Sequence, residues 1–443
     1  MDNRNRMKRE VYIVDGLRTP FLKARGKPGP LSASDLAVNA GRELLARQPF
    51  APTDLGEVIL GCMVPSPDEA NIGRLVALRL GCGKAMPAYT VQRNCASGMQ
   101  AIDSAVKDIA SGRHELVLAG GTEAMSHSPL LFNQKMVNWM SGLWGAKTLA
   151  AKLKQMADFR PGFLSPVIAL LHGLSDPTLN LSMGQTAENV AYRFNISREQ
   201  MDGYALQSHQ RAMYAEDHHY FSDVTPAFGY RGEFAVIDDG VRRDTTMEKL
   251  AALKPMFDKK FGTVTAGNSS QVTDGAALLL LASKEAVQKY HLPVLARIVD
   301  TEWAGLDPAE MGLGPVYAST TLLRRYNLRM NDIDYWELNE AFAAQVLGCV
   351  AAWEDEKYCR DFLGLDSAFG TLDLNRLNVD GGAIALGHPI GATGARIVLR
   401  LVDILKREKA KRGVATLCIG GGQGGAMLIE NVSDVGERQD ANL

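Results

Sequence analysis

Two cysteines and one histidine lie in segments made almost entirely of small residues and glycines. The segments are VQRNCASGMQA around Cys95, GGAIALGHPIGATGAR around His388 and TLCIGGGQGG around Cys418. A thiol, an imidazole to act as its base and a second thiol are the groups that thiol-based acyl transfer requires. A fourth segment, WELNEAFAAQ, adds the polar pair Asn339 and Glu340 at the entry to a helix. Each segment alone is a weak signal, and the four together indicate acyl-transfer chemistry.

Cys95 follows an apolar strand and precedes a predicted helix whose first turn contains Ala96, Ser97 and Gly98. Free backbone N–H groups and the positive end of the helix favour a thiolate at this place. We therefore expect a nucleophile whose pKa is lowered to about 3.5–7.5. The alternative is a small buried cysteine, which is the commoner fate of a free thiol.

His388 lies between Gly387 and Pro389 in a loop whose neighbours are nearly all small. Such a loop would let a substrate approach the ring, so His388 is the best candidate for the base that activates Cys95. A lone histidine is more often a structural hydrogen-bonding group, and this alternative stays open.

Cys418 ends an apolar strand and is followed, after Ile419, by three glycines that begin at Gly420. Glycines leave their N–H groups available to a developing oxyanion. Glycine-rich strand ends also occur for packing alone. The remaining cysteines have no comparable setting and are predicted to be structural: Cys62, Cys82, Cys349 and Cys359.

Composition limits the class of protein. The chain has 443 residues, 46% of them apolar and 22% charged, and a net charge of −2. This length predicts two or three structural units, and the charge gives no general reason to bind nucleic acid. Scattered cysteines without CxxC spacing favour a reducing compartment such as the cytoplasm, and no metal site is predicted. The sequence contains no apolar run long enough to span a bilayer, the basic N-terminus lacks the apolar stretch of a secretory signal, and the C-terminal QDANL is not a peroxisomal address.

Strands and helices alternate through the first half of the chain. EVYIVDGLRTPF, GEVILGCMV, AYTVQRN and ELVLAGG are predicted strands, and SASDLAVNAGRELLAR and SGMQAIDSAVKDIASG are predicted amphipathic helices. This alternation predicts a mostly parallel sheet covered by helices.

The same order recurs in the second half. GHPIGATGARIVLRLVDILKREKAKRGVATLCIGGG parallels NCASGMQAIDSAVKDIASGRHELVLAGG, because each has a reactive residue, a glycine-bearing turn, an amphipathic helix and a strand ending in glycines. We interpret this as an internal duplication, although any two βαβ stretches share some likeness. The alternation stops between about residues 125 and 249, which we interpret as an excursion inserted into the first unit.

The chain resembles the thiolase family over nearly its whole length. Seven segments carry the resemblance in the family's order: VDGLRTPF, NCASGMQA, GGTEAMS, GTVTAGNSSQVTDGAA, ELNEAFAAQ, GGAIALGHPIGATGAR and CIGGGQGGAM. The resemblance implies an α/β fold of two similar βαβαβαββ halves forming a five-layered α-β-α-β-α core with an inserted loop domain. We place the N-terminal half at 1–124 and 250–294, the loop domain at 125–249 and the C-terminal half at 295–443.

The resemblance also implies roles for individual residues. Cys95 matches the nucleophile that becomes acylated, His388 matches its base, and Cys418 matches the acid/base that protonates the leaving acetyl-CoA carbanion. Asn339, through a water, would share one oxyanion hole with His388, and the N–H groups of Cys95 and Gly420 would form the other.

Coenzyme A is the co-substrate that the resemblance implies, without any permanently bound cofactor. Ser270 matches the family's pantetheine-contacting serine, and Met183, Ala341 and Phe342 match neighbouring contacts. Arg242 or Arg243 would pair with the nucleotide or its phosphates, unless both are solvated.

Two positions bear on the subfamily. Ser182 stands where short-chain acetoacetyl-CoA thiolases usually have histidine, and Asn339 begins NEAF where subunits of fatty-acid oxidation complexes commonly have HEAF. The segment 133–171 resembles the loop region of those complex subunits, whose partner carries hydratase and dehydrogenase activities; the role of 133–175 stays open. Its basic and aromatic residues suit a partner or a membrane surface through 135–171, or a solvated helix that covers its own domain.

We therefore predict a 3-ketoacyl-CoA thiolase that acts in fatty-acid β-oxidation on medium or long chains and forms a homodimer or a dimer of dimers. The enzyme alternative is an acetoacetyl-CoA thiolase of four-carbon metabolism. A β-ketoacyl synthase fits less well, because the GHPIGATG histidine and the CIGGG cysteine suit thiolase chemistry. The alternative from another class is a catalytically idle acyl-CoA-binding protein, which should have lost Cys95, His388 or Cys418.

Overall fold

The structure, a computed structural model, describes residues 9–432. The first eight residues and the C-terminal QDANL, on which the predictions about targeting partly rest, lie outside the described residues. Within the described part of the chain, no helix is both long enough and apolar enough to cross a membrane.

One hydrogen-bonded path of strands runs through the molecule in the order β4-β3-β5-β12-β1-β13-β16-β15-β14, and the short strand β2 pairs with β12. The strands are β1 Val11–Arg18, β2 Leu22–Lys23, β3 Glu57–Gly61, β4 Ala88–Val91, β5 Leu116–Ala124, β12 Thr273–Ser283, β13 Ala296–Gly305, β14 Tyr335–Leu338, β15 Arg412–Ile419 and β16 Gln423–Asn431. At its centre the path is joined only by three residue pairs, which link Val11–Ile13 of β1 to Ala296–Ile298 of β13.

The two halves of this path repeat one topology. In the first half, β5 pairs in parallel with β3 and antiparallel with β12, which continues antiparallel to β1. In the second half, β15 pairs in parallel with β14 and antiparallel with β16, which continues antiparallel to β13. Even β4 has a counterpart, because Leu377 forms an isolated parallel bridge with Trp336 of β14. The predicted duplication is confirmed. The expectation of a mostly parallel sheet is wrong, because only the β3–β4, β3–β5 and β14–β15 pairs of the described sheet are parallel, and the strands at its centre are joined antiparallel.

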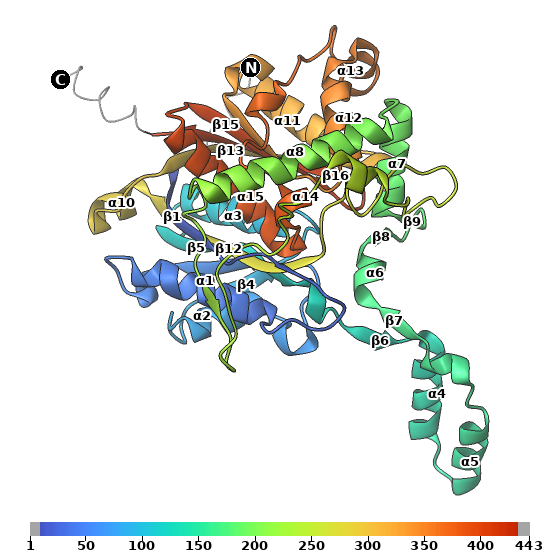
Figure 1. The fold of residues 1–443 in the computed structure, drawn as a ribbon. Helices are drawn as coiled ribbons and strands as arrows, with labels where there is room; N and C mark the ends of the chain where they lie inside the picture. The colour runs from blue at the N-terminus through green and yellow to red at the C-terminus, as the bar shows by residue number, and fades with distance from the viewer. Residues whose placement is uncertain (1–8, 433–443) are drawn as a thin grey trace, which may run out of the picture.

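Helices form three layers around the two half-sheets (Figure 1). The outer layer of the first half holds α1 Ala33–Ala46 and α2 Ile72–Arg79, and the central layer holds α3 Ser97–Ala110 and α15 Ile390–Arg407. The outer layer of the second half holds α7 Met183–Arg193, α8 Arg198–Asp217, α11 Gly314–Arg325 and α12 Ala343–Glu354. Shorter helices are α9 Met247–Ala251, α10 Lys284–Tyr290, α13 Glu356–Leu363 and α14 Ala383–Leu386. The predicted helix–sheet–helix–sheet–helix core is confirmed.

Apolar spacing explains the central helix α3. Met99, Ile102, Val106 and Ile109 recur at helical intervals, and all four are buried between the half-sheets. Each such burial stabilises the fold by about 1.5–3 kcal/mol. Gly112, with φ of +77°, ends the helical segment in a conformation that favours glycine.

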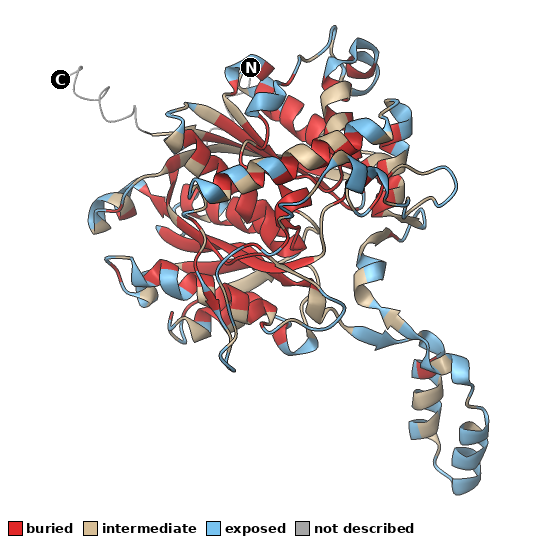
Figure 2. Cartoon of the chain, viewed as in Figure 1, coloured by how far each residue is buried: buried red, intermediate tan, exposed pale blue. Residues whose placement is uncertain are grey.

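Residues 130–168, which we call the arm, project away from the body of the molecule (Figure 1). Strands β6 Leu130–Phe132 and β7 Pro166–Ile168 pair antiparallel at its base, and α4 Gln134–Gly145 and α5 Leu149–Ala157 form a helical hairpin beyond them. Nearly all of the arm is exposed or half-exposed (Figure 2). After the arm come α6 Ala169–Gly173, β8 Ser175–Asp176 and β9 Leu181–Ser182, which lead into α7.

The predicted inserted segment 125–249 therefore contains two different parts. The arm extends outward, whereas α7 and α8 pack into the apolar cluster of the second half-sheet. The small pair β10 Ala227–Phe228 and β11 Phe234–Ala235 lies beside α1. The predicted limit at residue 124 coincides with the end of β5, the limit at 249 falls inside α9, and the limit at 294 falls between α10 and β13. The domain limits themselves remain a proposal.

Candidate active site

Cys95 lies in the turn between β4 and α3. Asn94 has φ of +44°, and the Ser97 hydroxyl donates to the Asn94 carbonyl over 2.7 Å while it accepts from Arg93 N–H over 2.9 Å. The Asn94 side-chain amide donates across the molecule to the Gly420 carbonyl over 2.8 Å. Cys95 is half-buried, whereas the other five cysteines are buried, so the turn presents one accessible thiol.

The Cys95 thiol has a raised pKa, which contradicts the expected lowering. Burial is the largest cause, and the Glu123 carboxylate adds to it. The N–H groups of Gly420 and of Cys95 itself donate to the sulfur and lower the pKa, but they do not offset burial. Sequence reasoning counted the helix end and missed the low-dielectric surroundings, which disfavour the charged thiolate. In this structure Cys95 is a neutral thiol that faces two preformed N–H donors.

His388 is buried at the start of the loop that enters α15. Its Nδ1 lies 2.7 Å from Thr393 Oγ1, and the Thr393 hydroxyl donates to the Pro389 carbonyl over 3.0 Å. Because that hydroxyl proton is used, Nδ1–H donates to Thr393 and Nε2 keeps its lone pair. Burial first, and the charge of Arg396 second, lower the pKa of His388 to about 3. The ring is therefore a neutral base.

Asn339 follows β14 and reaches the same place. Its side-chain amide nitrogen lies 3.5 Å from His388 Nε2, and its backbone N–H donates to the Thr416 carbonyl over 2.9 Å. Asn339 Oδ1 is buried and has no hydrogen-bond partner among the described residues. A buried unsatisfied polar atom points to a ligand or a water at the site. The prediction that Asn339 and His388 face a common point is therefore supported by geometry.

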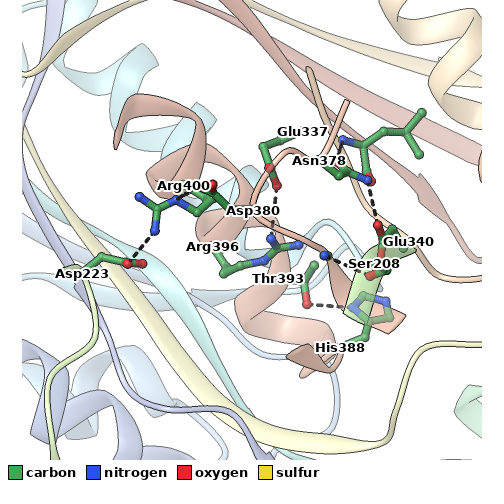
Figure 3. Close-up of polar contacts among 12 residues, drawn as sticks. Ser208, Asp223, Glu337, Glu340, Asn378, Asp380, His388, Thr393, Arg396 and Arg400 are labelled. Carbon is green, nitrogen blue, oxygen red and sulfur yellow. Dashed lines mark hydrogen bonds and ion pairs between the residues drawn. The ribbon is translucent and has the colours of Figure 1, made fainter. Parts of the chain in front are cut away.

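Glu340, beside Asn339, supports the histidine loop. Its carboxylate accepts from Ser208 Oγ over 2.6 Å, from Tyr204 OH over 3.0 Å and from the N–H of Ile384 over 3.1 Å. Asn378 Nδ2 donates to it over 3.2 Å. Figure 3 shows this cluster next to His388 and Thr393. Glu340 thus joins α8, β14 and the segment that precedes His388.

Cys418 lies in β15, opposite Gly424 of β16, and is fully buried. Gly421 and Gly422, with φ of +88° and +75°, form the hairpin turn after it, where other residues would be strained. Burial raises the pKa of Cys418 well above its usual range, and the neighbouring thiols Cys95 and Cys349 raise it further. Cys418 is therefore a protonated thiol beside Cys95 and can serve as a proton donor.

Glu123, at the end of β5, is a site residue that sequence reasoning missed. Its buried carboxylate accepts from the N–H groups of Met63 over 2.8 Å, Val64 over 3.0 Å and Gly391 over 2.9 Å. It therefore holds the loop after β3 against the start of α15, across the two halves. The only signal was a lone carboxylate after a run of apolar residues and glycines, which does not reveal its partners.

His388 lines a cavity of about 860 Å³. Four of the five residues predicted to contact coenzyme A line it, namely Met183, Arg242, Ser270 and Phe342. Ala341 does not line it, but its carbonyl accepts from the Ser270 N–H over 2.9 Å. The structure also separates the two candidate arginines, because Arg243 pairs with Glu216 over 2.8 Å and with Asp217 over 2.7 Å, away from the cavity lining.

The cavity lining contains further groups that come from distant parts of the chain. Lys23, His209 and Lys249 add polar groups, and burial, Arg242 and Lys23 lower the pKa of His209 to about 4. The apolar wall includes Leu171, Leu174, Leu250, Leu253, Met256 and Phe257. No local motif marks these residues, so only tertiary structure identifies them. Cys95, Cys418, Asn339 and Gly420 are not part of this lining, but Asn339 adjoins His388 and Gly420 adjoins Met183, and both His388 and Met183 line the cavity.

Comparison with known proteins places these features in a family. The family model described as Thiolase, N-terminal domain, matches residues 11–285, and the model described as Thiolase, C-terminal domain, matches residues 292–431. The chain is 39% identical over 424 residues to the mitochondrial trifunctional enzyme subunit beta of Bos taurus, which covers 95% of this chain and 88% of the relative. It is 40% identical over 436 residues to the beta-ketoadipyl-CoA thiolase of Pseudomonas knackmussii, which covers 96% of this chain and 100% of the relative.

Solved structures agree with this placement. The human mitochondrial 3-ketoacyl-CoA thiolase in complex with CoA superposes with a TM-score of 0.82 and 37% sequence identity, and the match covers 96% of this chain and 99% of that one. Two domain models that together account for most of the chain, and relatives that match end to end, are sufficient to assign the family. The chain belongs to the thiolase family and is an acyltransferase.

Proposed function

We propose that this enzyme cleaves 3-ketoacyl-CoA with coenzyme A, releasing acetyl-CoA and a shortened acyl-CoA, and that it acts on medium or long chains in fatty-acid β-oxidation. One observation carries the proposal. A neutral histidine, hydrogen-bonded through Nδ1 and facing the Asn339 amide at Nε2, lines a large cavity, and two protonated thiols, Cys95 and Cys418, lie next to each other at the Gly420 turn with two N–H donors on Cys95.

The first half-reaction forms an acyl-enzyme on Cys95. His388 Nε2 takes the Cys95 proton, and the thiolate attacks the 3-keto carbon, whose oxyanion is held by the N–H groups of Cys95 and Gly420. The bond between the second and third carbons then breaks, and its electron pair moves into a thioester enolate. Asn339, through a water, and the imidazolium of His388 stabilise that enolate. Cys418 donates the proton that completes acetyl-CoA.

The second half-reaction transfers the acyl group to coenzyme A. The His388 imidazolium returns its proton to the Cys418 thiolate and, as a neutral base again, takes the proton of the coenzyme A thiol. The new thiolate attacks the acyl-enzyme, Cys95 leaves as a thiolate, and the imidazolium reprotonates it. Every group ends in its starting state.

The cavity wall supports an acyl chain longer than four carbons. Leucine, methionine and phenylalanine side chains from α6 and its C-cap, from α9 and from the loop after α9 line it, and Ser182 takes little space where a histidine would fill it. Burying methylene groups of the chain against such a wall stabilises binding by about 0.8 kcal/mol each. An acetoacetyl-CoA thiolase, the alternative, would use this cavity for coenzyme A alone.

The basic lining supports binding of the coenzyme A phosphates. Lys23 and Arg242 are close enough that each cation lowers the pKa of neighbouring groups, and Lys249 is held by Asp244 over 2.5 Å. A cluster of cationic side chains whose charge is only partly neutralised by carboxylates is suited to binding phosphate groups.

CoA-dependent loss of three substrates tests the proposal: acetoacetyl-CoA, 3-ketohexadecanoyl-CoA and 3-oxoadipyl-CoA. A kcat/KM at least tenfold higher for the hexadecanoyl substrate supports it. Preference for acetoacetyl-CoA would indicate a role in four-carbon metabolism instead. Preference for 3-oxoadipyl-CoA would indicate that the basic lining binds the free carboxylate of that substrate.

We also propose that β4 pairs with the β4 of a second copy. It is an edge strand of the path, its four residues are half-buried, and it leads directly into the Cys95 turn. An unpaired edge of this kind favours strand addition. Light scattering coupled to size exclusion should give twice or four times the chain mass, and a monomer would contradict this proposal.

We propose that the arm contacts an anionic bilayer. The arm's exposed charged residues are four lysines and one arginine, with Asp158 as the single acidic residue. Its exposed large apolar residues include Phe132, Trp144, Leu149, Leu153 and Met156. Trp139 and Gln155 exchange hydrogen bonds of 2.7 and 3.1 Å that hold α4 to α5, so the hairpin presents a fixed surface. Exposed apolar groups flanked by lysines suit a lipid interface. A hydratase/dehydrogenase subunit as partner stays a prediction.

Vesicle flotation tests the arm. Binding to phosphatidylglycerol vesicles that is absent with phosphatidylcholine, and lost when Lys147, Lys152 and Lys154 are changed to Glu, supports the proposal. The same triple change at the exposed Lys406, Lys409 and Lys411 of the body is the matched control and should leave binding intact. No binding to either vesicle would refute it.

We also propose that the protein works in a reducing compartment such as the cytoplasm. All six cysteines are free thiols, which supports this proposal.

A further inference from the structure

A buried arginine lies behind the candidate base. Arg396 is on α15, three residues after Thr393, and is 1% exposed. Its Nη1 donates to Glu337 Oε2 over 3.1 Å, and Glu337 is fully buried two residues before Asn339 on β14. Figure 3 shows Arg396 between Glu337 and the His388–Thr393 pair. The ion pair therefore connects the helix that carries the base with the strand that carries its amide neighbour.

The charge of Arg396 is less balanced than that of the other buried arginines nearby. Arg18 pairs with Asp223 over 3.0 Å and with Asp238 over 2.7 Å, and Arg400 pairs with three carboxylates, those of Asp223, Asp380 and Asp403. Within residues 9–432, Arg396 has one ion-pair partner, and both Arg396 Nε and Glu337 Oε1 lack a hydrogen bond. Burial also raises the pKa of Glu337, which weakens the carboxylate as a counter-charge.

The unbalanced charge acts on His388. Burial disfavours the imidazolium most, and Arg396 is the charged group that disfavours it further. Other charged groups also face His388 and Arg396 from neighbouring elements, but each has partners of its own. Glu340 accepts from four hydrogen-bond donors. The remaining groups belong to the ion-pair network described above, namely Arg18, Arg400, Asp223 and Asp380. Burial therefore has the larger effect on the base, and Arg396 is the charged side chain that adds to it.

We propose that Arg396 is a positioning residue that keeps the His388 imidazole neutral before substrate binds, and that Glu337 fixes the guanidinium where it does so. The inference rests on the proposed role of His388 as the base for Cys95. A neutral imidazole can accept the Cys95 proton, and the imidazolium then formed next to Arg396 gives the proton back readily in each half-reaction. Without the cation, the site would rest further toward the thiolate–imidazolium pair.

The rate at which iodoacetamide alkylates Cys95 reports directly how much of the site is in the thiolate–imidazolium form. The thiol and imidazole share one proton, so each unit by which the pKa of His388 rises increases the thiolate fraction about tenfold. We expect Arg396→Met to raise the alkylation rate at pH 7 by about three- to tenfold. Glu337→Gln keeps the cation and a hydrogen-bond acceptor, and it should leave the rate unchanged or lower. The double variant Arg396→Met/Glu337→Gln leaves no charge at either of these two positions and should behave like Arg396→Met.

Two controls separate this inference from the proposed function and from misfolding. His388→Asn should slow alkylation, and if it does not, the role of His388 as base fails. If His388→Asn slows alkylation while Arg396→Met and the double variant leave the rate and the His388 ¹⁵N titration unchanged, Arg396 has no positioning role. Peptide mapping must show that the five buried cysteines stay unlabelled, which confirms that the variants are folded.

Discussion

Thr393 Oγ1 lies 2.7 Å from His388 Nδ1 and 3.0 Å from the Pro389 carbonyl oxygen, and these two contacts select the tautomer of His388. The Thr393 hydroxyl has one proton and donates it in the hydrogen bond to the Pro389 carbonyl. The imidazole must therefore be the donor in the hydrogen bond between Nδ1 and Thr393 Oγ1. Nε2 is therefore the acceptor and faces Asn339. The arrangement orients a base by a neutral hydroxyl rather than by a carboxylate.

Thr393→Val should weaken catalysis without unfolding the enzyme. Valine has the same shape but leaves Nδ1–H without an acceptor, and a buried unsatisfied donor costs about 1–3 kcal/mol. We expect kcat/KM to fall about 5- to 150-fold. Thr393→Ser keeps the hydroxyl and should retain most of the activity. Equal losses in both variants, measured by steady-state thiolysis, would show that the methyl packing matters and the hydrogen bond does not.

Cys95→Ala should abolish thiolysis, with a loss in kcat of at least about 10⁴-fold, because the covalent route disappears. Cys82→Ala is the matched control, since Cys82 is also a free cysteine but is buried outside the site. That variant should keep full activity and lose about 1 kcal/mol of stability. Activity surviving in Cys95→Ala would assign the nucleophile elsewhere.

Stability should fall as the pH drops below about 6.5, the ordinary pKa of histidine. His388 and His209 have pKa values lowered to about 3 and about 4 by burial, so the unfolded chain binds protons there that the folded chain does not. Each accounts for about 2 kcal/mol of lost stability at pH 5 relative to neutral pH. Urea midpoints of His209→Asn should show a smaller pH slope than the parent, while His219→Asn, at an exposed site, should show the parental slope.

Ser182→His should shift chain-length preference toward short substrates. Ser182 lines the cavity and caps α7, and an imidazole there would occupy space that we assign to the acyl chain. We expect the ratio of kcat/KM for 3-ketohexadecanoyl-CoA to that for acetoacetyl-CoA to fall at least about tenfold, which corresponds to about 1.4 kcal/mol. Ser182→Ala also loses the cap but adds no bulk, so its ratio should not change. A parallel shift in both variants would attribute the effect to the cap.

Sequence patterns predicted the parts of the fold that depend on local order. The apolar spacing of α3 and the strand that ends just before Gly420 follow from period and turn chemistry, and both are present in the structure, whereas β5 continues through Gly120 and Gly121 to Ala124. The repeated order of strands and helices likewise predicted the duplicated halves. These features are encoded by residues close together in the chain.

Other features depend on contacts between distant segments and could not be predicted. The raised pKa of Cys95 follows from burial, which only the assembled layers produce. The Glu123 carboxylate accepts hydrogen bonds from the N–H groups of Met63 and Gly391, which belong to different halves of the molecule, and no local sequence motif predicts these contacts. The arm was expected as an excursion, but its outward direction follows from the pairing of β6 with β7, two three-residue strands far apart in the sequence.

The most direct test of the account is the acyl-enzyme itself. The enzyme is mixed with 3-ketohexadecanoyl-CoA without free coenzyme A, quenched in acid and mapped by mass spectrometry. We predict a tetradecanoyl thioester on the peptide that contains Cys95, which disappears when coenzyme A is added before the quench. No adduct, or an adduct on Cys418 or any other cysteine in its place, would contradict the assignment of Cys95 as the nucleophile.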